Sequence, residues 1–580
     1  MKGNTLIINR IHTIGVLFLL LSASSCTASQ NNQLKHAQPP NFIFYLTDDQ
    51  DKLDYGTYGN PNVHTPNVDK LASEGIQFNK AFTGQAICAP SRSQLFTGLY
   101  PIKNGTFINH VGSKNGLLSI TQLLKDAGYE VVLAGKKHVK PKSVYNWDKY
   151  FNDQPYEGFE MHNAIPIDSI SSYLKTVTKP FCLFIASHYP HGPYPDPEKS
   201  SYTHDDIIAH PYKNKKTINL DRMVGYYENI KRDDQMLGWV LDLVDSNSSL
   251  DNTLFIYSAD HGSSGKFTVR DAGLNVPFIA RWPGVIKPDT ETSAMIHYTD
   301  VLPTFLDLAG SEIPSYLDGK SFKEVLLGKE NEHQKYVYGV ANHQNQLIPY
   351  IFPSRLLRSE QFAYIKNFNS IDNYEENYGD DPNINKFIKR AALKFKAPKE
   401  ELYDMVKDPY QLHNLAKDPD YAVIKEDLNR KLTLWMIQQD DYLLDHGLPV
   451  IYAPNTALDQ RKRLNKIPDD LVGILKDTKV IFKTKELDFP LSLSPKVGLE
   501  KISFSDRAIS VKSGETEKVS IAFAPSDASD KTVYWWSSNP SVAEIDQNGQ
   551  IMALAKGITE IQAMAFDGHH MASCELEVIE

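Results

Sequence analysis

The chain has 580 residues, of which 41% are hydrophobic, and its formal net charge is -10 at pH 7. This length supports a large hydrophobic core and predicts two or three domains rather than one. The mild acidity argues against nucleic acid as a partner, since binding phosphates favours a basic face. It leaves an anionic substrate open, because a few lysines and arginines in a cleft can reverse the local field.

The first 26 residues have the pattern of a targeting segment. Lys2 and Arg10 give a positive start, residues 14–21 form a short apolar run, and small residues lead to Cys26. This ending resembles the cleavage site of bacterial lipoproteins, which implies that Cys26 is lipidated and contacts membrane lipid; an ordinary secretory peptide is the alternative. Both interpretations predict export in a bacterium, to the periplasm, the outer membrane or the cell surface, with residues 27–39 as a flexible tether. No later segment reaches membrane-spanning length.

From Asn41 onward, short apolar strands alternate with helical patterns. The sequence predicts a strand at 41–49, a capped helix at 65–78, a helix with a glycine turn and a strand at 119–138, and further strands within 179–191 and 252–262. This βαβ rhythm predicts an α/β domain over residues 40–330, built on a mostly parallel sheet that helices cover.

Six residues with metal-binding or acid–base side chains follow directly after predicted strands. In parallel sheets the chemistry collects beyond the carboxyl ends of the strands, so we expect these side chains to lie close together. They are Asp48, Asp49, His138, His188, Asp260 and His261.

The composition and pattern of the sequence change twice after this domain. Residues 331–460 indicate a smaller α+β subdomain, and residues 461–497 read as a linker because they are charged and then proline-rich. Residues 498–580 combine short alternating strands with turns, which predicts an all-β sandwich that resembles bacterial Ig-like modules. Trp535 and Trp536 are either a sugar platform or part of a spacer or adhesion module, and strand alternation requires one of them to face the core.

The four cysteines, Cys26, Cys88, Cys182 and Cys574, have no spacing that predicts a disulfide framework or a zinc site. Cys88 stands at the start of a predicted helix in CAPSRSQLFTG, residues 88–98. This string resembles the signature of type I sulfatases. The resemblance implies an alkaline-phosphatase-like fold in which a maturation enzyme, a partner of the chain, oxidises Cys88 to formylglycine.

The resemblance also implies a mechanism. One hydroxyl of the hydrated aldehyde attacks sulfur, and a covalent sulfated enzyme forms as the alcohol leaves. The second hydroxyl then expels sulfate by collapsing back to the aldehyde. The negative charge of such a transition state spreads over several oxygens, so catalysis consists of positioning and electrostatic stabilisation. A hard divalent cation with oxygen ligands suits this task, Ca²⁺ first and Mg²⁺ as the alternative.

The expected metal ligands are Asp48, Asp49, Asp260, His261 and position 88 itself. Asp48 and Asp49 are adjacent carboxylates that repel each other unless a cation lies between them, which is an independent reason to expect metal. Asp260 matches the third carboxylate of the family. His261 departs from its commonest form, which has asparagine there, although iduronate sulfatases carry histidine.

The remaining expected catalytic residues are basic. Arg92 lies four residues after Cys88, one helical turn away on the same face, where it can pair with the aldehyde hydrate or with a metal-binding carboxylate. By resemblance, Lys136 contacts sulfate, His138 orients or deprotonates the diol, and Lys266 binds sulfate. His188 serves the leaving-group oxygen and matches the family position better than His191.

The sequence therefore predicts a sulfatase that removes sulfate from sugars of a sulfated polysaccharide, in exo fashion. Segments 135–150, 358–369 and 401–415 resemble N-sulfoglucosamine sulfohydrolases, which leaves N-sulfate open beside O-sulfate. His343 lies in a loop that either reads the sugar or is polar surface. Two alternatives are a phosphonate or phosphate ester hydrolase of the same superfamily and a non-catalytic envelope protein that binds carbohydrate.

Overall fold

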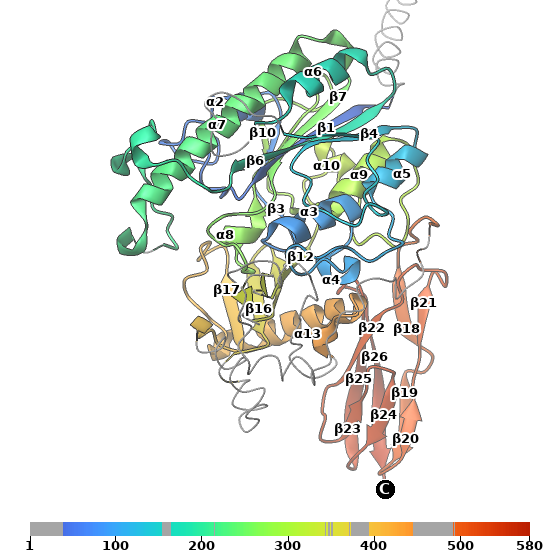
Figure 1. Ribbon diagram of the computed structural model, residues 1–580. Helices are drawn as coiled ribbons and strands as arrows, with labels where there is room; N and C mark the ends of the chain where they lie inside the picture. Colours follow the sequence, from blue (N-terminus) through green and yellow to red (C-terminus); the bar gives the residue numbers. More distant parts are fainter. Residues whose placement is uncertain are drawn as a thin grey trace, which may run out of the picture.

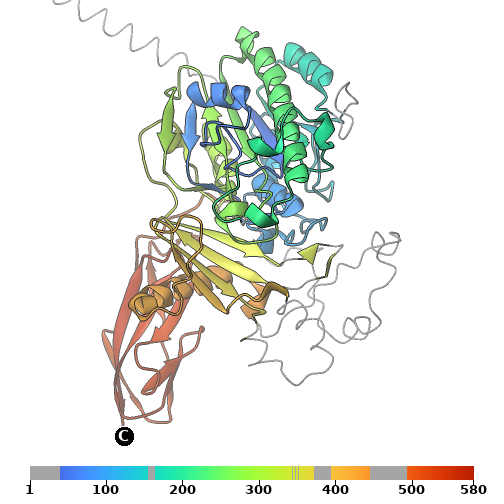
Figure 2. The same cartoon turned by 90° about the vertical axis from the view of Figure 1, so that its left-hand side faces the viewer.

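A computed structural model describes most of the chain, in three parts that Figures 1 and 2 show. The predicted targeting segment, nearly all of the tether and most of the linker lie outside the described residues, as does His343. The described residues are 39–153, 164–213, 215–342, 352–370, 394–444 and 493–580, with short pieces at 344–345, 348–349, 372 and 491.

An eight-stranded sheet forms the centre of the first part, in the order β10-β2-β9-β7-β1-β6-β4-β5. Strands β7, β1, β6, β4 and β5 are parallel neighbours, and β9 runs antiparallel to β7 and β2. This confirms the mostly parallel α/β sheet. The strands are β1 (Asn41–Asp48), β2 (Ile76–Phe78), β4 (Glu130–Gly135), β5 (Lys149–Phe151), β6 (Phe181–Pro190), β7 (Thr253–Ala259), β9 (Phe278–Arg281) and β10 (Thr290–Thr292).

The central strands bury both faces, because helices cover the sheet on each side (Figure 1). Along β1, Phe42, Phe44 and Leu46 point into one core while Ile43 and Tyr45 point into the other, as the two-residue period of a strand requires. One face packs on α2 (Pro66–Ser73), α6 (Ile167–Thr176) and α7 (Leu220–Asp245). The other packs on α3 (Cys88–Thr97), α5 (Ile120–Asp126), α9 (Val301–Leu308) and α10 (Lys323–Leu326).

The helix predicted over residues 65–78 is shorter than expected. It ends at Ser73, and Ile76–Phe78 form the strand β2. Gly75 lies at this break, where the chain passes so close to β9 that a Cβ would come within 2.3 Å of the Ala280 carbonyl oxygen. Thr65, the N-cap residue of α2, makes no side-chain cap hydrogen bond. A remote cap takes its place, because the carboxylate of Asp234 on α7 accepts hydrogen bonds from the backbone N–H groups of residues 67 and 68.

A small three-stranded sheet links the domain to the next part, with β3 (Ala81–Phe82), β8 (Asn275–Val276) and β11 (Ile296–His297). The short helices α4 (Pro101–Asn104) and α8 (Asp271–Leu274) lie nearby in Figure 1. The second part is an antiparallel sheet of β12 (Tyr336–Ala341), β15 (Ser354–Ser359), β16 (Phe362–Asn367) and β17 (Glu400–Asp404), on which α13 (Ala422–Gln438) packs.

A buried ion pair fixes the end of α13 to this sheet. The Arg355 guanidinium on β15 binds both carboxylate oxygens of Asp441, at 2.5 and 3.0 Å, and neither side chain is exposed. Removing one partner of such a pair leaves an uncompensated buried charge and costs about 3–5 kcal/mol.

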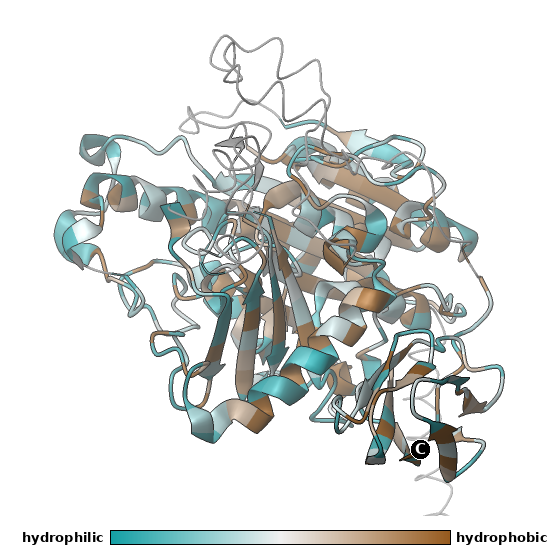
Figure 3. Cartoon of the chain, turned by 90° about the horizontal axis from the view of Figure 1, so that it is seen from below, coloured by the Kyte–Doolittle hydropathy of each residue, from teal (hydrophilic) through white to brown (hydrophobic). Residues whose placement is uncertain are grey.

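Seen from below, hydrophobic colouring concentrates on the interior strands and hydrophilic colouring on the peripheral loops (Figure 3).

The third part is all-β, and the described residues after 493 contain no helix. Trp535 is 7% exposed within its core, whereas the ring of Trp536 lies under the Arg430 guanidinium of α13, 5.0 Å from the ring centroid. This confirms that one tryptophan faces the core, and it shows that the other contacts α13. The strands are β18 (Lys501–Phe504), β19 (Ala508–Lys512), β20 (Thr516–Lys518), β21 (Ile521–Ala524), β22 (Val533–Ser537), β23 (Ala543–Ile545), β24 (Gln550–Ala553), β25 (Gly557–Ala565) and β26 (Met571–Ile579).

Within the part of the chain that the structure describes, no helix has both the length and the apolar character to cross a membrane.

Candidate active site

The predicted site residues converge at the carboxyl edge of the central sheet. Asp48 ends β1, Lys136 follows β4, and Asp260 follows β7, while Cys88 is the first residue of α3. Asp49, the residue after β1, has a φ of 62°, an uncommon conformation for a residue other than glycine. The parallel strands therefore gather residues that are up to 218 positions apart, the interval between Asp48 and Lys266.

Cys88 lies at the centre of this cluster and is 2% exposed. Its Sγ is 3.4 Å from His261 Nε2, 3.7 Å from Asp49 Oδ1 and 3.8 Å from Lys266 Nζ. Burial raises the pKa of the thiol, and the nearby Lys136 only partly opposes this. The thiol is therefore protonated at neutral pH, unlike the thiolate of a cysteine nucleophile.

Arg92 reaches the cluster from one turn further along α3 and is fully buried. Its Nε donates to Asp260 Oδ2 at 3.1 Å, and its Nη1 donates to the backbone oxygen of Lys136 at 3.2 Å. Nη2 lies 3.6 Å from Asp48 Oδ1. One guanidinium thus holds carboxylates from two strands in fixed positions, which a planar, always charged group does well.

The first two carboxylates are each paired with a lysine. Lys136 Nζ contacts Asp48 Oδ2, and Lys266 Nζ lies 2.7 and 2.9 Å from the two oxygens of Asp49. Burial alone would raise both carboxyl pKa values, but the pKa of Asp48 is held well below its usual range by Lys136 and Arg92, and that of Asp49 by His261 and Lys266. Both acids are therefore ionised at neutral pH.

The third carboxylate and its neighbour close the cluster. Asp260 Oδ1 accepts a hydrogen bond from the backbone N–H of Asp49 at 3.1 Å, and His261 Nε2 lies 2.9 Å from Asp49 Oδ1. Burial raises the pKa of Asp260, and the charge of Asp48 adds to this. Burial acts to lower the pKa of His261, but Asp260 and Asp49 raise it well above its usual value. The negative charges of Asp49 and Asp260 thus hold the imidazole in place.

Two of the predicted histidines have different surroundings. His138 Nε2 is 2.8 Å from His110 Nδ1, and burial together with Lys136 lowers the pKa of His138 to about 2, so this imidazole is neutral. His188 Nε2 is 2.6 Å from Asp153 Oδ2. His191, three residues further along, lies with its Nε2 3.6 Å from Asp49 Oδ2. Sequence reasoning assigned the leaving-group role to His188 in preference to His191.

Sequence reasoning missed three residues that support the site. His110 contacts His138, Asn109 Oδ1 accepts from the backbone N–H of Ala89 beside Cys88 at 3.2 Å, and Ser91 Oγ donates to the Asp260 carbonyl at 2.5 Å. Ser91 belongs to the motif and could have been named from it. His110 and Asn109 lie in a loop with no motif, and no pattern in the sequence connects them to Cys88.

The residues present fit a hard divalent cation. Asp48, Cys88 and Asp260 place potential ligand atoms within 4.8 Å of one another, and so do Asp49, Cys88 and His261. Asp48 Oδ1 is buried and has no hydrogen-bond partner among the described residues, which is costly unless another group completes it. Three carboxylates and a single imidazole form an oxygen-rich set of the kind that Ca²⁺ and Mg²⁺ prefer.

Comparisons with known proteins agree with this geometry. The family model for sulfatases matches residues 40–311, the one for the C-terminal part of N-sulphoglucosamine sulphohydrolase matches 259–394, and the one for the bacterial Ig-like domain (group 2) matches 499–576. An ulvan-active sulfatase of Formosa agariphila is 52% identical over 442 residues, which cover 75% of this chain and 88% of that protein. The chain belongs to the sulfatase family.

More distant relatives extend this result. Human N-sulphoglucosamine sulphohydrolase is 26% identical to the sulfatase over 488 residues, covering 74% of this chain and 94% of that protein. A solved structure in complex with its substrate D-glucosamine-2-N,6-O-disulfate superposes with a TM-score of 0.54 at 21% identity, over 70% of this chain and 99% of that one. This superposition shows that the two chains share a fold. The predicted alkaline-phosphatase-like α/β fold with an appended Ig-like part is confirmed.

The enzyme class follows from the family: the chain is a sulfuric ester hydrolase. Members of this family generally use a formylglycine and a divalent metal. The two alternatives drawn from the sequence, a phosphonate or phosphate ester hydrolase and a non-catalytic carbohydrate-binding protein, are not favoured, because the relatives named above are sulfatases or sulphohydrolases.

Proposed function

We propose that this sulfatase hydrolyses sulfate esters on sugars of a sulfated polysaccharide or its oligosaccharides, with Cys88 matured to formylglycine. The observation that carries the proposal is the single buried cluster in which Cys88 lies within 3.8 Å of Asp49, His261 and Lys266. We assign a divalent cation, Ca²⁺ first, to Asp48, Asp49, Asp260, His261 and position 88.

The modified residue supplies the nucleophilic oxygen and the cation supplies charge stabilisation, while the chain's own side chains position the sulfate. Lys136 and Lys266 bring ammonium groups to the carboxylates at the sheet edge, and Arg92 locks Asp48 and Asp260 in place. Fixed positive charges of this kind stabilise negative charge that spreads over sulfate oxygens without reorganising during the reaction.

Two proton transfers need two different groups. Burial and Lys136 lower the pKa of His138 to about 2, which keeps its imidazole neutral but makes it a weak base, so we assign it to orienting the attacking hydroxyl. The leaving oxygen needs a donor, and the candidates are His188 and His191 at the end of β6. The 3.6 Å approach of His191 to Asp49 favours His191 over His188, which pairs with Asp153.

The substrate we propose first is the polysaccharide ulvan, through an O-sulfate. The support is the 52% identity to an ulvan-active sulfatase, over 88% of that protein. An N-sulfated glucosamine is the second candidate, because residues 259–394 match the C-terminal part of N-sulphoglucosamine sulphohydrolase. The predicted departure at His261 argues for the O-sulfate, since sulfamidases resemble this chain but carry asparagine there.

We further propose that the protein is exported and lipidated at Cys26, that a formylglycine-generating enzyme is its maturation partner, and that it works at a bacterial envelope. The support is the sequence pattern of residues 1–26 and the bacterial Ig-like match at 499–576. We also propose domain limits of 40–330, 331–460 and 498–580. Because Trp536 lies under Arg430, we propose that the Ig-like part is a spacer or adhesion module rather than a sugar platform.

Paired assays test the proposed reaction. The purified, matured protein should hydrolyse 4-nitrophenyl sulfate faster than 4-nitrophenyl phosphate, and it should release sulfate from ulvan oligosaccharides faster than from N-sulfated glucosamine. Faster turnover of the phosphate ester would contradict the sulfatase assignment. Preference for the N-sulfate would contradict the ulvan assignment alone.

A further inference from the structure

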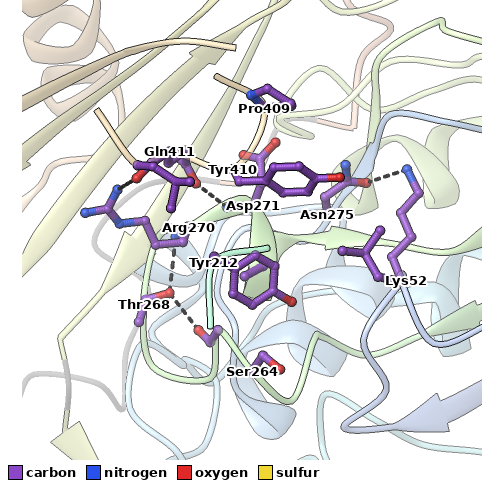
Figure 4. A pocket seen from close by; sticks show the side chains of 14 residues that line it. Lys52, Tyr212, Ser264, Thr268, Arg270, Asp271, Asn275, Pro409, Tyr410 and Gln411 are labelled. Carbon is purple, nitrogen blue, oxygen red and sulfur yellow. Dashed lines mark hydrogen bonds between the residues drawn. The ribbon is translucent and has the colours of Figure 1, made fainter. Parts of the chain in front are cut away.

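A pocket of about 420 Å³ opens beside the catalytic cluster, between segments far apart in the sequence (Figure 4). We call it the Tyr410 pocket. Its walls come from the loop after β1, the loop around Tyr212, the loop after β7 with α8, and the turn after β17. The residues that matter for its chemistry are Lys52, Tyr212, Arg270, Asp271, Tyr410 and Gln411.

The pocket and the catalytic cluster share one loop, residues 262–268. Ser264, Gly265 and Thr268 line the pocket, while Lys266 between them lies 3.8 Å from Cys88 Sγ. The backbone N–H and the hydroxyl of Ser264 both donate to the buried carboxylate of Asp51, which anchors the loop. A molecule in the pocket therefore lies across a single loop from the position where we place the sulfate.

Two polar atoms of the lining residues lack partners. Gln411 Oε1 accepts a hydrogen bond from the backbone N–H of Asp271 at 2.9 Å, which fixes the orientation of the amide. The amide nitrogen, Nε2, is a donor with no hydrogen-bond partner among the described residues. Asp271 Oδ2 accepts from Arg358 Nε at 3.3 Å, and Asp271 Oδ1 has no partner in the same set. An unsatisfied buried donor or acceptor costs about 1–3 kcal/mol, so these groups call for a ligand or water.

Backbone strain accompanies the unpaired donor. Gln411 has a φ of 56°, in the left-handed region that residues other than glycine seldom adopt. The residue is nonetheless only 8% exposed, and the backbone N–H of Asp271 holds its side chain. Strained residues held by their surroundings cluster at binding sites, which is consistent with a positioned amide rather than a loose loop.

The cations of the pocket are already engaged. Lys52 Nζ contacts the Asn79 carbonyl and lies 3.5 Å from Asn275 Oδ1, and the Arg270 guanidinium pairs with Glu401. The lining therefore offers no uncommitted positive group for a second sulfate. It offers a donor, an acceptor and two tyrosine rings, Tyr212 and Tyr410, whose centroids are 6.4 Å apart at an interplanar angle of 49°.

These features match an uncharged sugar ring. Each hydroxyl both donates and accepts, so a vicinal diol can satisfy the Gln411 amide and the Asp271 carboxylate together once these buried atoms turn toward the pocket. The C–H face of a pyranose can pack on Tyr410, which is 38% exposed. We propose that the Tyr410 pocket is a second saccharide subsite, which binds the sugar unit next to the one that carries the sulfate; this rests on the proposed function.

Kinetics of paired substrates test the subsite. Tyr410→Ala and Gln411→Glu, which replaces the donor by an oxygen, should lower kcat/KM for a sulfated tetrasaccharide with an uncharged sugar next to the sulfated unit by about tenfold and leave 4-nitrophenyl sulfate unchanged. Tyr410→Phe keeps the ring and should behave as wild type. His413→Ala is the matched control, because His413 lies on the same turn, is 81% exposed in its side chain and does not line the pocket.

A binding measurement separates this proposal from the proposed function. Saturation-transfer NMR with the desulfated form of this tetrasaccharide should show contact with the wild-type protein and with His413→Ala, and reduced contact with Tyr410→Ala. Equal signals in all three proteins, or none in any, would overturn the subsite even if sulfate hydrolysis is observed. Equal losses on both sulfate substrates would also overturn it, whereas absence of hydrolysis with the expected NMR pattern would refute only the reaction.

Discussion

Replacing Lys266 by methionine removes a positive charge from the site while nearly keeping the shape of the side chain. Lys266 Nζ lies 3.8 Å from Cys88 Sγ and 2.7 Å from an Asp49 oxygen. A unit charge acting over about 4 Å at an effective dielectric constant of about 20 contributes on the order of 4 kcal/mol. Loss of one fixed donor to a developing anion costs other enzymes about 10²–10³ in kcat, a similar free energy.

We therefore expect Lys266→Met to lower kcat/KM for 4-nitrophenyl sulfate by about 10²–10³-fold. Lys266→Arg keeps the charge and should lose less. The mass of the peptide that contains residue 88 must be measured in each variant, because poor maturation would also lower activity. A loss smaller than about threefold in fully matured Lys266→Met, which corresponds to less than about 0.7 kcal/mol, would refute the electrostatic role assigned to this lysine.

Two further predictions concern the metal and the pH dependence of stability. Chelation should abolish hydrolysis and lower the melting temperature, and Ca²⁺ should restore both, because a ligand stabilises only the state that binds it. Asp49→Asn should lose the Ca²⁺-dependent rise in melting temperature. An unchanged wild-type melting temperature on adding Ca²⁺ would contradict the site. Burial raises the pKa of Asp233 to about 8, so the folded state retains a proton that the unfolded state releases near pH 4. The free energy of unfolding should therefore fall as pH rises from about 4 to about 8, at up to about 1.4 kcal/mol per pH unit. Denaturant unfolding of Asp233→Asn should show a weaker decline over this range than wild type, and identical slopes would contradict this assignment.

Much of the fold could be predicted because its signals are local. The apolar runs of β1, β6 and β7 are long enough to mark buried strands, and their carboxyl ends placed the acids and His188 on one edge. The spacing of Cys88 and Arg92 is a property of one helix, and the structure shows both at the same cluster. Sequence reasoning erred over residues 65–78, where the constraint on Gly75 comes from Ala280 in another strand.

The parts of the site that escaped prediction depend on contacts between loops. The pairing of His138 with His110, and that of His188 with Asp153, joins residues whose local sequences carry no shared pattern. The same holds for the Tyr410 pocket, whose walls come from four separate segments. Periodicity and motifs report which residues share an element, but they do not report which loops meet above a sheet edge.

The intact mass of the tryptic peptide that contains Cys88 tests the proposed nucleophile most directly. In protein produced with a formylglycine-generating enzyme, conversion of the thiol to an aldehyde should lower this mass by about 18 Da relative to unmodified cysteine, and only the converted fraction should hydrolyse sulfate esters. An unmodified thiol in protein that is fully active on 4-nitrophenyl sulfate would contradict the proposed chemistry.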